Sequence, residues 1–352
     1  MNRWAPIVGI AGLIGCGIGL VFTARAALAA WLVAWLAWGS VPIGALALLM
    51  LVALIPGTWR ALYAEPLTIG ASLMPLVLIA VVPLLIGLGL IYPWTHPEIA
   101  STLTGFKGLW LSSTFFVVRN VVFLIVLSGF AWALLSGGTR SRAAIAAIGV
   151  IVYALIGSLI GIDFAESTEP LFHSSIYGLI ALTNQWLAGI SFAIIVGLWR
   201  SEGEAPRSAA GVLVTAIILW AYMHAMQYIV IWSGDIPSEA RWYLERGNGL
   251  WWALAWAVFG LQGFVPFAAL LSPTVRRSRR AMVALAGVTL AMRLAENAWL
   301  VLPGLAGIGW AAAPLIVAAS AAMLGCGWWA ATRTRRSGRW NEAGWVSETR
   351  SI

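Results

Sequence analysis

Histidine, glutamine and tyrosine occur together inside an apolar segment of the chain. His224, Gln227 and Tyr228 lie in AYMHAMQYIVIW, at a spacing that places them on one side of a helix. Histidine titrates near neutral pH, and glutamine and tyrosine can order water through hydrogen bonds. The pattern predicts either a path for protons or an interhelical hydrogen-bond network that only packs the helices.

A second polar group lies in the apolar segment that contains MRLAENAW. Here Arg293 and Glu296 are three residues apart, so they share one helix face and can neutralise each other locally. Alternatively, Arg293 holds Glu296 in a site that also includes another helix, where Glu296 carries protons. The sequence leaves both interpretations open.

Three more ionisable residues lie inside apolar segments or at their ends. Arg119 keeps its charge and is either one half of a structural ion pair or a fixed charge in a hydrophilic pathway. Asp163 ends one apolar segment, and Glu65 stands at the start of another. For Glu166 and Glu169, which follow Asp163, solvated loop charges are the simpler interpretation.

Several classes of function lack their residues in this chain. The two cysteines, Cys16 and Cys326, each stand in a GCG triplet, and no CxxC or Cys/His cluster occurs. We therefore expect no metal site, iron–sulfur cluster or covalent haem here. No nucleotide-binding glycine loop or serine–histidine arrangement appears, so we expect no catalytic residues. The net charge of +8 comes from arginines between apolar segments, which argues against nucleic-acid binding.

Composition indicates a polytopic, all-α integral membrane protein. Of the 352 residues, 61% are hydrophobic and 10% are charged, against about 25% charged in soluble domains. A spanning helix needs about 20 apolar residues. Ten segments meet this length: 5–23, 27–55, 67–92, 108–136, 142–163, 173–199, 208–234, 249–272, 280–302 and 308–331. We expect one transmembrane domain over 1–335 and a short cytoplasmic tail over 336–352.

Basic residues predict the orientation of these helices. With ten crossings, fifteen arginines fall on the side of the termini and four basic residues on the other side, which favours cytoplasmic termini. The first set is Arg3, Arg60, Arg140, Arg142, Arg200, Arg207, Arg276, Arg277, Arg279, Arg280, Arg333, Arg335, Arg336, Arg339 and Arg350. The second is Arg25, Lys107, Arg241 and Arg246. The long loops 93–107, 164–172 and 235–248 then face outward, which is the periplasm for a bacterial inner membrane.

Five segments in order resemble one family. The chain is similar to the ActF-type membrane subunit of bacterial alternative complex III, within the NrfD-like group of polysulfide-reductase membrane anchors. The resemblance covers roughly residues 40–305. The segments are YPWTHPE (92–98), WLSSTFFVVRN (110–120), IDFAESTEPLFHSSIYG (162–178), QYIVIWSGDIPSEARWYLER (227–246) and MRLAENAWLVLP (292–303).

The resemblance implies two four-helix bundles plus a helix pair, and no cofactor in this chain. It implies partners as well: a sister NrfD-like membrane subunit that holds the quinol, and periplasmic subunits that carry iron–sulfur clusters and haem c. A neighbouring terminal oxidase is a further expected partner. The expected function is a membrane subunit of a quinol:cytochrome c oxidoreductase with a proton pathway. A purely structural anchor and a standalone transporter of protons or small solutes are the alternatives.

Single residues can be matched to the family pattern. Arg119 matches the arginine of its FFxxR helix, and Asp163 the aspartate that opens a D-W-x-M-S-L-type segment, which here reads DFAEST. A later His-Trp pair is replaced by Leu171 and Phe172, with a histidine displaced to His173. Further matches are Ser174, Tyr177, Gly178, Gln227, Trp232, Glu239, Trp242 and Tyr243.

Two sets of candidate residues result. The proton-pathway candidates are Glu65, Arg119, Asp163, His224, Gln227, Tyr228, Arg293 and Glu296. The candidates for docking of periplasmic partners are Asp235, Glu239, Trp242 and Tyr243.

Overall fold

The chain folds into long apolar helices. The computed structural model describes residues 4–136, 139–199 and 202–336, so all of the predicted tail 336–352 except Arg336 lies outside the described residues. Within the described residues, nine helices are long and apolar enough to cross a membrane. The prediction of an all-α, multi-pass membrane protein is confirmed.

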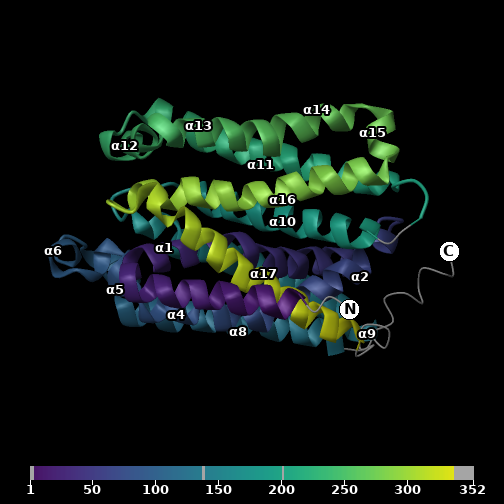
Figure 1. Ribbon diagram of the computed structural model, residues 1–352, viewed down its shortest axis with the longest axis horizontal. Helices are drawn as coiled ribbons and strands as arrows, with labels where there is room; N and C mark the ends of the chain where they lie inside the picture. The colour runs from purple at the N-terminus through teal and green to yellow at the C-terminus, as the bar shows by residue number, and fades with distance from the viewer. Residues whose placement is uncertain (1–3, 137–138, 200–201, 337–352) are drawn as a thin grey trace.

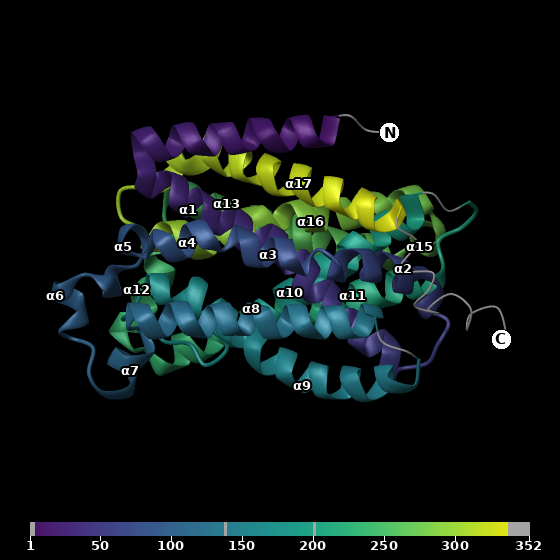
Figure 2. The same ribbon diagram turned by 90° about the horizontal axis from the view of Figure 1, so that it is seen from below.

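The first helix, α1 (Trp4–Leu54), makes two crossings. Its 51 residues would span about 75 Å at 1.5 Å per residue, more than twice the roughly 30 Å of a bilayer core. The backbone at Thr23 leaves the helical region, with φ −147° and ψ 60°. There the chain turns back on itself, as Figure 2 shows. Counted this way, the described residues hold the ten crossings that the sequence predicts.

The first bundle combines the second half of α1 with three further crossings. These are a broken crossing over 60–91, then α8 (Ser113–Ser136) and α9 (Thr139–Phe164). The broken crossing consists of α2 (Arg60–Ala71), α3 (Met74–Ala80), α4 (Val82–Ile86) and α5 (Leu88–Ile91). It begins at residue 60 and not at the predicted 67, because the charged residues in its first turns lower the mean hydropathy there. Indole N–H groups of Trp31 and Trp35 donate to the carbonyls of Ala80 and Val77, at 2.7 and 3.1 Å.

The second bundle has the same number of crossings in the same alternating order. It contains α10 (Tyr177–Trp199), α11 (Arg207–Gly234), α13 (Gly249–Val258) continued through a π-helical segment into α14 (Val265–Leu271), and α16 (Arg279–Val301). The short α15 (Pro273–Arg277) leads into α16. Finally, α17 (Ala313–Arg336) packs along the first half of α1. Figure 1 shows the two bundles with α17 lying across α1, which confirms the expected arrangement of two four-helix bundles and a helix pair.

The two ends of the bundles differ in character. One, the arginine end, carries Arg60, Arg207, Arg276, Arg277, Arg279 and Arg280. The other, the loop end, carries the segments 92–112, 165–176, 235–248 and 302–312, with α6 (Pro97–Ala100), α7 (Gly105–Trp110) and α12 (Pro237–Arg246). Figure 2 shows α6, α7 and α12 at the end opposite to α15. The three predicted outward loops therefore do lie together.

Glycines permit a close contact between the bundles. A Cβ atom on Gly44 of α1 would lie 1.8 Å from the carbonyl oxygen of Gln185 on α10, and one on Gly189 would lie 2.7 Å from the carbonyl carbon of Gly44. Small residues allow membrane helices to approach this closely. The first helices of the two bundles thus meet backbone to backbone.

We predict that Gly44→Ala destabilises the chain in detergent. The added methyl group has no space at this crossing, and overpacking of this kind costs about 1–3 kcal/mol. Thermal unfolding followed by circular dichroism measures the effect. Gly211→Ala on α11 is the matched control, because a Cβ there meets nothing within 4 Å and should leave the unfolding temperature unchanged or higher. Equal behaviour of the two variants would contradict the crossing.

Candidate functional site

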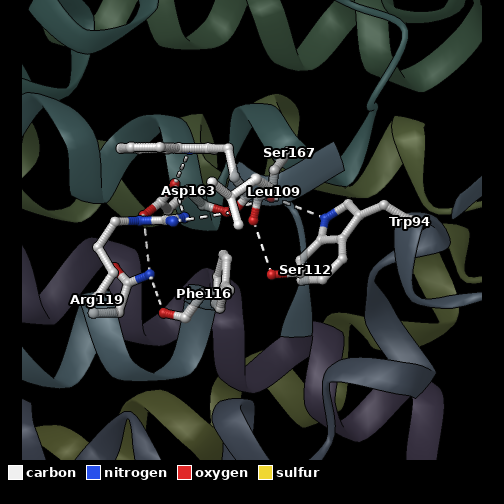
Figure 3. A network of polar contacts seen from close by, with 9 residues as sticks. Trp94, Leu109, Ser112, Phe116, Arg119, Asp163 and Ser167 are labelled. Atoms are coloured by element: carbon white, nitrogen blue, oxygen red, sulfur yellow. Dashed lines mark hydrogen bonds and ion pairs between the residues drawn. The ribbon is translucent and has the colours of Figure 1, made fainter. Parts of the chain in front are cut away.

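One buried polar cluster joins α8 to α9 at the loop end of the first bundle (Figure 3). Asp163 is completely buried. Arg119 donates through Nε to Oδ2 and through Nη2 to Oδ1, both at 2.9 Å. Asn120 donates to Oδ2 at 2.9 Å, and the indole of Trp110 to Oδ1 at 3.0 Å. Each carboxylate oxygen therefore receives two hydrogen bonds.

Aromatic rings enclose this ion pair. The guanidinium carbon of Arg119 lies 3.7 Å from the centre of the Trp110 ring, a cation–π contact. Trp94 donates to the Ser167 hydroxyl at 3.4 Å, and that hydroxyl bonds to the backbone carbonyl of Asp163. Arginine, amide and indole groups act only as donors here. The contacts thus favour the structural interpretation of Arg119, with Asp163 as the partner that the sequence did not identify.

A second cluster is centred on Glu296 of α16. One carboxylate oxygen, Oε1, accepts from Trp220 Nε1 at 3.0 Å and contacts His224 Nε2 at 2.9 Å. The other, Oε2, accepts from Gln262 at 2.7 Å and is ion-paired with Arg293. The local pair with Arg293 exists, and α11 also contributes to the site, while proton carrying by Glu296 stays a prediction.

All four crossings of the second bundle contribute to this cluster. Arg293 donates through Nε to the Gln262 side-chain oxygen at 3.1 Å and through Nη1 to Asn184 of α10. Asn297 donates to the backbone carbonyl of Arg293 at 2.7 Å. Every one of these residues is buried. The cluster therefore ties α10, α11, the π-helical segment and α16 to one another.

The two carboxylates differ in one chemically important neighbour. Among the described residues that contact Asp163, no donor titrates near neutral pH, whereas Glu296 contacts the imidazole of His224. Of the four side chains that contact Glu296, only the imidazole of His224, 2.9 Å away, belongs to a residue type that titrates near neutral pH. The Glu296 cluster thus differs from the Asp163 cluster in containing a histidine.

Gln262 is a site residue that the sequence analysis missed. It lies in the π-helical segment Phe259–Phe264. Four residues later, Pro266 has no N–H group to bond the carbonyl of Gln262, and π-bulges often mark functional positions. A glutamine inside FGLQGFVP was the available signal. Asn184 was missed as well.

Gln227 connects this region of α11 to the loop end. Its side-chain oxygen accepts from the Ser174 hydroxyl at 3.0 Å, and its amide donates to the Tyr243 hydroxyl at 3.5 Å. The backbone N–H of Ser174 donates to Glu166 at 2.9 Å. Burial raises the pKa of Tyr243 to about 12, so this phenol keeps its proton at neutral pH.

Two proton-pathway candidates, Tyr228 and Glu65, lie outside both buried clusters. His224 and Gln227 are buried, but Tyr228 is 53% exposed and packs edge-on against Tyr243 on the outside of the bundle. The three residues span about 100° of the helix surface, and only part of that surface faces the interior of the bundle. Glu65 is half-buried on α2, at the arginine end.

The docking candidates divide into exposed and buried residues. Asp235 is exposed and adopts a left-handed conformation with φ 45°, and Glu239 and Tyr243 are half-buried. Trp242 is only 2% exposed and stacks on Phe172, with ring centres 5.0 Å apart. It belongs to the packed interior of the loop end, because α12 lies flat on the bundle with this side inward.

Arg246 holds the loop end together. Its guanidinium donates to the backbone carbonyls of Trp299 and Leu300, at 3.1 and 2.7 Å, and to Glu169 at 2.5 Å. Burial raises the pKa of the Glu169 carboxyl, and the charge of Arg246 opposes that rise. Glu169 is therefore an ion-paired, largely covered side chain and not the solvated loop charge of the simpler interpretation.

Comparisons with known proteins add no family assignment. No protein-family model matches the chain, and no curated protein matches it.

Within the described residues, no group of three or more histidine, cysteine, aspartate and glutamate side chains could hold a metal ion. The chain is a multi-pass membrane protein whose bundles each enclose a paired carboxylate.

We predict that Arg119→Met strongly destabilises the first bundle. It leaves Asp163 charged and unpaired in a buried position, and breaking a buried pair in this way costs about 3–5 kcal/mol. The double variant Arg119→Met/Asp163→Leu should recover much of the loss. Thermal unfolding in detergent gives both values, with Arg241→Met at an exposed position as the control. A double variant as unstable as the single one would contradict the ion-pair assignment.

Proposed function

We propose that the chain is an integral subunit of a quinol:cytochrome c oxidoreductase complex, in which it anchors periplasmic redox subunits and binds protons at Glu296. The observation that carries the proton-binding part is the buried contact of 2.9 Å between Glu296 and His224. The five ordered motifs and the two-bundle fold support the assignment to a respiratory complex.

Energetics favour a proton-binding role for this cluster over simple packing. A buried ion pair costs desolvation energy, and apolar residues of similar volume often stabilise a protein as well or better. Ionisable groups inside membrane bundles accordingly tend to serve function. The Arg119–Asp163 pair already ties two helices together without a titratable partner. The histidine beside Glu296 supplies a hydrogen bond, as a non-titratable donor could, and it also supplies an exchangeable proton.

The loop end is the proposed docking face for extrinsic subunits. Asp235 and Arg241 are exposed there, on and beside a helix that the Arg246 contacts hold in place. Iron–sulfur clusters and haem c would reside in these periplasmic partners, and quinol in a sister membrane subunit beside this chain. Proton binding at Glu296 would then respond to charge or shape changes in those neighbours. A terminal oxidase is a further proposed neighbour.

Purification from native membranes tests the assignment to a respiratory complex. The tagged protein is extracted in mild detergent, and the eluate is analysed by mass spectrometry and by haem and iron–sulfur spectra. Co-purifying cytochrome c and iron–sulfur subunits are the expected result. A colourless, homogeneous and stable protein would overturn the proposal and favour a transporter that works alone.

We predict that Glu296→Gln lowers the number of protons released per electron while the complex still assembles. Glutamine keeps the shape of the side chain and one acceptor oxygen, but its NH2 group only donates and it holds no exchangeable acid proton. Proton release and quinol oxidation are measured together in proteoliposomes. Tyr228→Phe is the control, since this side chain lies outside the bundle. Normal assembly with unchanged proton release in Glu296→Gln would leave only the structural-anchor alternative.

A further inference from the structure

We infer that Glu296 exchanges its proton with the loop end only, through a half-pathway formed by His224, Gln227 and Ser174. This inference deepens the proposed function, because it rests on Glu296 as a proton-binding group. It states from which face the proton comes. It also states that the second bundle provides no complete route across the membrane.

The depth of the cluster is the first argument. Glu296 lies five residues before the end of α16 at Val301, and seventeen residues after its start at Arg279. At 1.5 Å per residue these separations correspond to about 8 Å and about 25 Å along the helix axis. The carboxylate is therefore much nearer to the loop end than to the arginine end.

Polar side chains continue from the cluster toward the loop end. His224 contacts Glu296, and Gln227 follows one turn further along α11. Gln227 is hydrogen-bonded to the Ser174 hydroxyl at 3.0 Å. Ser174 is half-buried, and the next residue toward the surface, His173, is exposed. Hydroxyl, amide and imidazole groups in this order can relay a proton, directly or through single water molecules.

Water has room beside the cluster as well. A cavity of about 30 Å³ lies between the two bundles, with Asn184, Asn297 and Gln185 in its lining. That volume holds about two water molecules. Asn184 contacts Arg293 and Asn297 is bonded to its backbone, so water in this cavity would touch the surroundings of Glu296.

The opposite direction is closed by apolar side chains. The buried hydroxyls next in this direction are Thr289, one turn before Arg293 on α16, and Ser191, two turns after Asn184 on α10. Beyond them α16 reads AMVALAGV over 281–288, and α10 reads FAIIVGLW over 192–199. Eight helical residues correspond to about 12 Å. Thr215 of α11 is exposed and bonds to its own helix at Gly211, so it does not enter this layer.

Tight packing fills the apolar layer. Its core consists of Leu213, Ile217, Leu270, Met282 and Ala286, all at most 3% exposed. Protein interiors packed in this way exclude water, and a proton cannot cross without a polar carrier. The second bundle therefore binds protons from one face, and net transfer across the membrane requires a route outside this bundle.

Accessibility of single thiols to silver ions, which are about as small as water, tests this arrangement. Cys16 and Cys326 are first replaced by alanine. Gln227→Cys, Ala216→Cys and Ser208→Cys are then introduced one at a time along α11. Spheroplasts expose one membrane face to Ag⁺ and inside-out vesicles expose the other. After denaturation, maleimide labelling counts the thiols that Ag⁺ did not block.

We expect Ag⁺ to block Gln227→Cys several-fold faster from the side of the loop end than from the side of the arginine end. Ala216→Cys, inside the apolar layer, should stay protected from both faces, and Ser208→Cys should react from the arginine face. Rapid blocking of Ala216→Cys from the arginine face would overturn the half-pathway, as would a Gln227→Cys protected from the loop face. Ser174→Cys replaces Gln227→Cys if the latter fails to fold.

The outcome is independent of the respiratory assignment. Thiol accessibility needs only the folded chain in a membrane, whereas the assignment depends on co-purifying redox subunits. Absence of such subunits with the expected thiol pattern would overturn the complex and leave the half-pathway intact. Co-purifying redox subunits together with rapid blocking of Ala216→Cys from the arginine end would overturn the half-pathway and leave the complex intact.

Discussion

A carboxylate buried in a membrane bundle must be surrounded by hydrogen-bond donors, and this constraint organises the structure. Each bundle meets it in a similar way. The carboxylate stands on the fourth crossing, as Asp163 on α9 or Glu296 on α16, and an amide from the third crossing, Asn120 or Gln262, donates to it. Because the donors come from different helices, the helices cannot slide or rotate without leaving a charge unpaired. The ion pairs thus fix the register that apolar packing alone leaves loosely defined.

The difference between the two clusters suggests a division of labour. Asp163 receives four hydrogen bonds from groups that only donate, and it lies among aromatic rings. Glu296 contacts His224 and lies beside a small cavity. The first arrangement contains no partner that titrates near neutral pH, whereas the second contains a histidine. We therefore propose that the first bundle is the rigid support, and that the second bundle responds to its partners through the protonation of Glu296.

The sequence predicted the crossings well, because hydropathy reports the bilayer directly. It also placed Arg293 and Glu296 together, since residues three apart on a helix must be neighbours. The sequence did not predict contacts between distant segments, such as the ion pair of Asp163 with Arg119. A single sequence does not reveal which helix faces pack against each other. Gln262 was missed because its π-helical turn depends on Pro266, and Arg246 was counted as a loop charge because the folding of α12 onto the bundle carries no periodic signal.

Infrared difference spectroscopy of the native complex tests the central claim most directly. Quinol is added to the oxidised enzyme, and the carbonyl stretch of protonated carboxylic acids is followed. If Glu296 binds and releases a proton, a band in this region should change on quinol oxidation, shift with ¹³C-labelled glutamate and disappear in Glu296→Gln. A spectrum in which wild type and Glu296→Gln are identical would show that this carboxylate keeps one protonation state, and it would contradict the account.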